Sequence, residues 1–129
     1  MKMRLLFTAI LVLAVLSAAI VTSADGVTKR IRFAKGRHSA TVSNSVVRGD
    51  RDTYILGAGA GQMMTVGIKS LEDNAVFQIE NPDGEYLDGA GETDDATTFY
   101  SQLPDKGDYK IIVGGTRGNA SYKLTVSIK

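Results

Sequence analysis

Apolar and polar side chains alternate along most of the chain after Asp25, in short runs separated by Gly, Asn, Asp or Pro. This period of two is typical of strands that bury one face, because successive side chains of a strand point to opposite sides. The clearest run comes last, where polar residues separate Tyr122, Leu124, Val126 and Ile128. No helical period follows residue 25, so the pattern predicts β structure throughout.

Turn-forming residues divide this pattern into eight or nine short strands. We expect strands near residues 27–33, 38–47, 53–56, 64–68, 77–79, 85–87, 97–103, 109–113 and 121–129. The segment Asn81-Pro82-Asp83-Gly84 suits a type I turn, with Pro second and Gly fourth. The number and spacing of the strands predict an all-β fold, an antiparallel two-sheet β-sandwich.

The first 24 residues have the layout of a removable export signal. Lys2 and Arg4 form a short basic start, and an apolar run of 17 residues follows from Leu5 to Val21. That run lies at the short limit for a membrane anchor, which favours a removable signal. The small residues Thr22 and Ala24 fit the positions before a cleavage site, so we expect cleavage after Ala24. The prediction is a signal peptide at residues 1–24 and one domain at residues 25–129. The domain would be periplasmic or secreted and free of the membrane after cleavage.

Composition removes several classes of chemistry. Cysteine is absent and His38 is the only histidine, which excludes disulfides and thiol catalysis and argues against His-dependent triads and zinc sites. We therefore expect a protein that is not an enzyme, with no catalytic residue, no metal site and no cofactor. Without its signal the chain has a net charge of −1, which argues against a nucleic-acid partner.

Charge is unevenly distributed along the chain. Residues 72–108 hold eleven carboxylates against Lys106 alone, a net charge of −10, whereas residues 26–51 have a net charge of +6. Charged edges and loops that prevent strand pairing would explain this pattern. An acidic face that steers a cationic partner is the alternative explanation, and the sequence does not decide between the two. Under the second explanation, the partner-binding residues of the loop 88–95 are Asp88, Glu92, Asp94 and Asp95.

Several segments resemble small bacterial periplasmic lysozyme inhibitors of the invertebrate and goose lysozyme types. The segments that carry the resemblance are residues 32–36, 39–42, 52–56, 60–66, 103–109 and 121–126. The resemblance implies an exported protein that binds a lysozyme and inserts a loop into its active-site cleft. The motifs Ala60-Gly61-Gln62 and Gly107-Asp108-Tyr109 are also similar to pre-peptidase C-terminal domains of secreted hydrolases. That alternative implies an accessory module for carbohydrate, calcium or surface binding.

In invertebrate-type inhibitors the resemblance implies a Ser-Gly-x-Tyr element whose Ser and Tyr enter the lysozyme cleft. The matching residues are Lys106, Gly107 and Tyr109, so a lysine stands in the place of the serine. Its ammonium would meet catalytic carboxylates as a charge-assisted partner. Tyr109 also shares a strand face with Ile111 and Val113, which favours a core tyrosine whose hydroxyl holds a neighbouring turn. Both interpretations of Tyr109 stay open, as do the lysozyme type and a homodimer.

Overall fold

The computed structural model describes residues 26–129, which form eight strands and no helix. The predicted signal peptide lies outside these described residues. The strands are β1 (Thr28–Arg30), β2 (Ser39–Val46), β3 (Arg51–Ala58), β4 (Met63–Ser70), β5 (Ala75–Glu80), β6 (Thr98–Gln102), β7 (Gly107–Gly115) and β8 (Ala120–Ile128). Between residues 26 and 129, no helix is long and apolar enough to cross a membrane.

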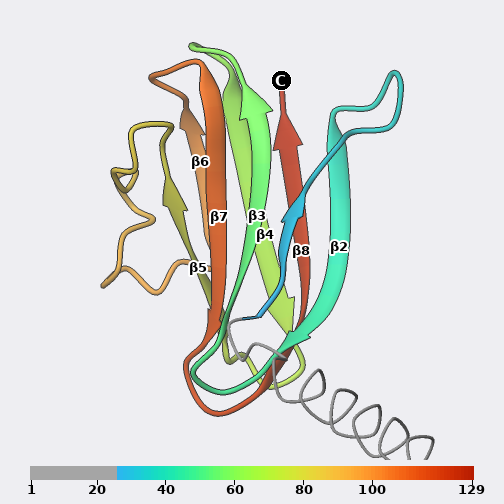
Figure 1. The fold of residues 1–129 in the computed structure, drawn as a ribbon, viewed down its shortest axis with the longest axis vertical. Helices are drawn as coiled ribbons and strands as arrows, with labels where there is room; N and C mark the ends of the chain where they lie inside the picture. Colours follow the sequence, from blue (N-terminus) through green and yellow to red (C-terminus); the bar gives the residue numbers. More distant parts are fainter. Residues whose placement is uncertain (1–25) are drawn as a thin grey trace, which may run out of the picture.

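The strands form two four-stranded sheets that pack face to face (Figure 1). One sheet has the order β1-β3-β7-β5 and the other β2-β8-β4-β6, which confirms the predicted all-β sandwich. Two local predictions were wrong. β1 is shorter than the expected strand 27–33 and pairs parallel with β3. Residues 85–87 form no strand, because only Tyr86 bridges back to Glu80.

The core lies between the sheets and consists of the inward residues of each alternating run. On β7, Tyr109, Ile111 and Val113 are fully buried, as the period-two pattern predicts. The β8 series packs against them from the opposite sheet, and Leu124 and Val126 are also fully buried.

A buried carboxylate links the two sheets at one place. Asp52 on β3 is 1% exposed, and its Oδ2 accepts a hydrogen bond of 2.6 Å from the Tyr122 hydroxyl on β8. Its Oδ1 accepts the Val27 N–H at 3.0 Å, which fixes the start of β1. The Tyr54 hydroxyl lies 2.5 Å from that of Tyr122. Burial raises the pKa of Tyr122 far above its usual range, and the hydrogen bond to Asp52 adds to this shift.

Candidate functional site

The acidic loop, which we define as residues 81–97, runs along the edge of β5 and covers it (Figure 1). The Leu87 N–H donates to the Ile79 carbonyl and the Ile79 N–H donates to the Ala90 carbonyl, both at 2.9 Å. Further along the loop, Ala96 bridges Phe77. The loop therefore pairs with a strand edge that would otherwise stay open, which is the structural role expected of charged edge segments.

Hydrogen bonds within the acidic loop fix its shape. The Asn81 Oδ1 accepts the Asp83 and Glu85 N–H groups at 2.9 Å. The Asp94 Oδ2 accepts the Gly91 N–H at 2.7 Å. The Tyr86 hydroxyl donates to Glu92 at 3.3 Å. Burial raises the pKa of Tyr86, and the nearby Glu92 charge raises it further.

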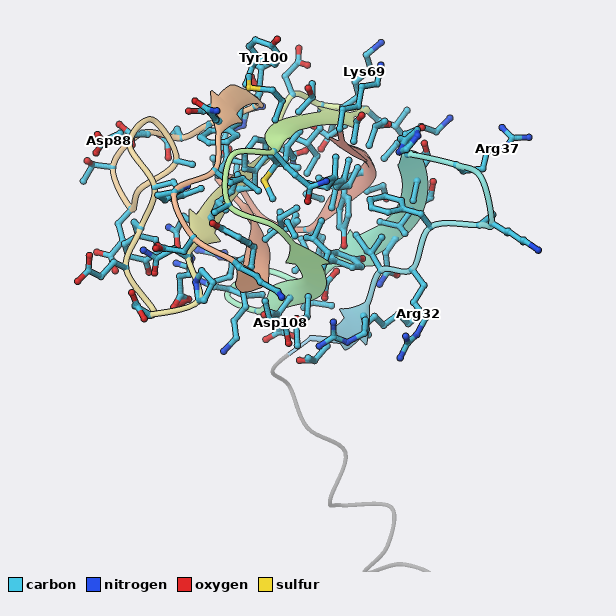
Figure 2. The ribbon with its side chains drawn as sticks, turned by 90° about the horizontal axis from the view of Figure 1, so that it is seen from above. Arg32, Arg37, Lys69, Asp88, Tyr100 and Asp108 are labelled. Atoms are coloured by element: carbon cyan, nitrogen blue, oxygen red, sulfur yellow. The ribbon has the colours of Figure 1, made fainter. Side chains whose placement is uncertain are left out.

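All four predicted carboxylates of this loop are exposed. Figure 2 shows Asp88 at the periphery of the molecule, pointing away from the sandwich. Asp94 differs from the other three, because its exposed carboxylate also accepts a hydrogen bond from the Gly91 N–H of the loop backbone. A partner can therefore approach these carboxylates directly.

The Lys106 turn, residues 103–106, connects β6 to β7 and presents an exposed lysine. Tyr109 holds this turn from below, because its buried hydroxyl donates to the Asp105 carbonyl at 2.7 Å and accepts the Asp105 N–H at 3.1 Å. The Tyr109 side chain is 0% exposed. This confirms the core interpretation and leaves its ring outside the surface that a partner could touch. Burial also raises the pKa of Tyr109.

Gly107 has a structural role beside this turn. Its φ of +147° is a conformation that other residues rarely adopt, and a Cβ there would lie 2.8 Å from Pro82 Cγ. The glycine thus allows the turn to pack against the first residues of the acidic loop. Lys106 is the one residue of the matching Lys106-Gly107-Tyr109 set whose side chain is free to meet a partner.

A hollow of about 330 Å³ lies on the outer side of the β1-β3-β7-β5 sheet, where the acidic loop passes over β5. Its polar lining includes Asp50, Arg51, Gln78, Glu92, Asp95 and Thr116. Arg51 Nη1 donates to Gln78 Oε1 at 3.1 Å across its floor. Sequence reasoning missed this hollow, since its residues come from strands and loops far apart along the chain. The one hint in the sequence is that the alternating pattern places Arg51 and Gln78 on the outer face of their strands.

The structure separates the predicted site residues into two groups. Glu92 and Asp95 line the hollow together, near the Ile112 and Gly114 end of β7. Lys106 precedes the other end of β7, roughly 20 Å away along the strand. The Pro82 end of the acidic loop therefore lies beside the Lys106 turn, whereas Glu92 and Asp95 lie far from it.

One carboxylate of the acidic region is neutralised within the molecule. Arg30 forms the only ion pair among residues 26–129, a bidentate contact with Asp108 at 2.5 and 3.1 Å. The guanidinium lowers the pKa of Asp108, and the carboxylate raises that of Arg30. The same part of the chain holds no group of three His, Cys, Asp or Glu side chains that could bind a metal ion. The other carboxylates of residues 72–108 form no ion pair within the described part of the chain.

The chain was compared with known proteins. No protein-family model and no curated protein matches it. Among solved structures, an Aeromonas hydrophila periplasmic inhibitor of g-type lysozyme, PliG, is 33% identical with a TM-score of 0.70, over 81% of this chain and 99% of that one. An Escherichia coli PliG mutant is 25% identical with a TM-score of 0.64, over 81% and 99%.

The pre-peptidase C-terminal domain of a Bacillus anthracis collagenase also has this fold. It is 16% identical with a TM-score of 0.58, over 84% of this chain and 100% of that one. At that identity the likeness concerns the fold alone. The higher identity to the Aeromonas hydrophila protein, over nearly its whole length, decides between the two resemblances. The chain belongs to the PliG family, whose solved members are periplasmic inhibitors of g-type lysozyme.

Proposed function

We propose that this protein is a periplasmic inhibitor of a g-type lysozyme. The observation that carries the proposal is the 33% identity to the Aeromonas hydrophila inhibitor over 99% of that chain. The export signal predicted for residues 1–24 would deliver the domain of residues 25–129 to the same compartment. Lys106 stands where the invertebrate-type element has a serine, and this difference favours the goose type. The protein acts by binding, and it performs no catalysis of its own.

We further propose that the Lys106 turn enters the lysozyme cleft. Lys106 is exposed on this turn, and two hydrogen bonds between the Tyr109 hydroxyl and the Asp105 backbone hold the turn in place before any partner arrives. A turn that is ordered in the free protein loses little conformational entropy on binding. The Lys106 ammonium offers three donors, which suits a cleft that carries catalytic carboxylates.

The acidic surface supplies the second part of the proposed contact. The region 72–108 has a net charge of −10, and the ion pair with Arg30 neutralises only Asp108. Such a field accelerates the approach of a cationic lysozyme. Glu92 and Asp95 line a hollow large enough for a side chain, so a basic segment of the lysozyme would dock there. Lys106 and the hollow would then act as two separate points of contact.

A panel of lysozymes tests the function. The mature protein is added to g-type, invertebrate-type and chicken-type lysozymes, and the residual lytic activity of each is measured. We expect inhibition of the g-type enzyme and little effect on the other two. Inhibition of the invertebrate type alone would contradict the assignment, as would activity against none.

A matched pair of lysine variants tests the cleft contact. Lys110 is exposed on β7, four residues beyond Lys106, and lies on the sheet rather than on the turn. Lys106→Ala should raise the dissociation rate about 30-fold or more, because truncating one partner of a buried charge pair costs about 2–5 kcal/mol. Lys110→Ala should leave that rate unchanged. Equal effects of both variants, measured by surface plasmon resonance, would show that only net charge matters.

A pair of double variants separates the hollow from general steering. Glu92→Gln with Asp95→Asn neutralises the hollow, whereas Asp83→Asn with Glu85→Gln neutralises exposed carboxylates of the same loop away from it. Both pairs should slow association to a similar extent, since both reduce the same field. Only the first pair should also speed dissociation. Identical dissociation rates would contradict a contact at the hollow.

A further inference from the structure

The hydroxyl face, which we define as the outer face of the β2-β8-β4-β6 sheet, differs in chemistry from the rest of the surface. Serine and threonine alternate outward along β2 and β8 and meet in register across the strands. Two of these pairs hydrogen-bond through their side chains, Thr41 with Thr125 at 3.3 Å and Ser45 with Ser121 at 2.8 Å. The four strands contain no Asp or Glu. The face is therefore a flat array of hydroxyl groups without acidic residues.

Its only cations, Lys69 on β4 and Lys123 on β8, are directly opposite each other in the ladder. Like charges at such positions repel and destabilise a sheet. Neither lysine forms an ion pair within residues 26–129. Protection of sheet edges does not explain them, because the edges of this sheet are β2 and β6, which carry no charged residue, while β4 and β8 are central. A pair of cations held at a cost on a central ladder fits an anionic ligand.

Three hollows lie along this face, and the lysine pair lines two of them. One of about 330 Å³ and one of about 260 Å³ are both lined by Lys69 and Lys123, together with neighbouring hydroxyl residues. The third, of about 380 Å³, shares Gly67, Thr98 and Thr125 with the second and reaches Tyr100. Gly67 lines both the second and the third hollow, and its missing side chain leaves the space between them open, since a Cβ there would meet nothing within 4 Å. The hollows thus form one shallow path from the lysines to the tyrosine.

Tyr100 on β6 is 72% exposed and marks the other end of this path. Figure 2 shows Tyr100 and Lys69 projecting from the same side of the sandwich, while Asp108 and Arg32 lie on the opposite side. Tyr100 pairs with Thr65, which lies four residues before Lys69 on β4, so the two ends are about 13 Å apart. An oligosaccharide covers this span and a single sugar does not.

We propose that the hydroxyl face binds an anionic glycan whose charges are carboxylates. The lysine pair would hold a carboxylate, the serine and threonine hydroxyls would exchange hydrogen bonds with sugar hydroxyls, and the ring of Tyr100 would pack against a sugar ring. Serine and lysine are depleted at protein interfaces, whereas both are prominent on this face. A second copy would bring four lysines together, and nucleic acid would demand more than two cations. The ligand is a glycan, as is the substrate of a lysozyme, and it would bind a surface separate from both proposed lysozyme contacts.

The test is a titration of the mature protein with oligogalacturonate, in which calorimetry measures the affinity and amide chemical shifts locate the binding site. Its fully methyl-esterified form is the neutral control. We expect oligogalacturonate to shift amides of β4, β6 and β8, with affinity about tenfold or more above that of the ester, a difference of about 1.4 kcal/mol. Absence of binding, equal affinity for the ester, or shifts confined to the other sheet would overturn the proposal.

Three variants make the test specific. Gly67→Thr fills the open position with a residue that strands prefer, so it should weaken binding about tenfold or more without lowering the melting temperature. Lys69→Gln with Lys123→Gln should weaken binding equally, and Lys110→Gln on the other sheet should change nothing. Unchanged glycan binding in Gly67→Thr would overturn the proposal. Loss of lysozyme inhibition in that variant would assign the face to the lysozyme instead, and self-association through the face would assign it to a second copy.

Discussion

Replacement of Tyr109 by Phe removes one hydroxyl from the core and leaves the ring in place. That hydroxyl makes two hydrogen bonds with the Asp105 backbone, at 2.7 and 3.1 Å. A net contribution of about 0.5–1.5 kcal/mol for each bond predicts a loss of about 1–3 kcal/mol in the free energy of unfolding. For a domain of this size the melting temperature should fall by roughly 4–8 °C for each kcal/mol.

Urea unfolding, monitored by circular dichroism, measures this loss in the free energy of unfolding directly. Tyr100→Phe is the matched control, because the Tyr100 side chain is 72% exposed. The Tyr109→Phe variant should inhibit lysozyme less well only because the Lys106 turn becomes less ordered, since the hydroxyl itself does not touch the partner. A stability change below about 0.5 kcal/mol would refute the anchoring role, since surface substitutions alone give values of that size. Unchanged stability together with lost inhibition would show that the hydroxyl touches the partner.

Four further outcomes are expected. Asp52→Ala should cost about 3 kcal/mol or more in urea unfolding, because it leaves the Tyr122 hydroxyl and the start of β1 without their buried acceptor; a loss under about 1 kcal/mol would contradict that role. Gly107→Ala should lower the melting temperature through its contact with Pro82, and an unchanged melt would count against the strained turn. Association with lysozyme should slow between 0.1 M and 1 M salt, as the screening length falls from about 10 Å to about 3 Å; salt-independent rates would exclude steering. N-terminal sequencing of the periplasmic protein should begin at Asp25, whereas retention of Met1 would disprove cleavage.

The fold was largely predictable because every second residue is apolar along each run. The period-two pattern identified the inward face of β7 and β8 and favoured a core position for Tyr109, without deciding it. The pattern gave no sign that β1 pairs parallel with β3, because alternation within a strand carries no information on the direction of its neighbour. The start of β1 is held by a residue 25 positions away, since the Asp52 carboxylate accepts the Val27 N–H. It also wrongly predicted a strand at residues 85–87, where the loop follows the β5 edge and forms a single bridge.

The candidate site was predictable only where its residues are neighbours in sequence. Lys106 stands beside Gly107 and Tyr109, so the resemblance could single it out. The hollow beneath Glu92 and Asp95 needs the register of β3, β7 and β5, which no local pattern contains. The lysine pair of the hydroxyl face is a further example, because a separation of 54 positions becomes direct opposition only when β4 and β8 pair.

Titration of a g-type lysozyme with the purified mature protein is the decisive test of the proposed inhibition. We expect lytic activity to fall in proportion to added inhibitor and to be abolished at about one equivalent, because one inhibitor molecule occludes one cleft. Lysozyme that stays fully active at a large molar excess of correctly folded protein would contradict the proposed inhibition.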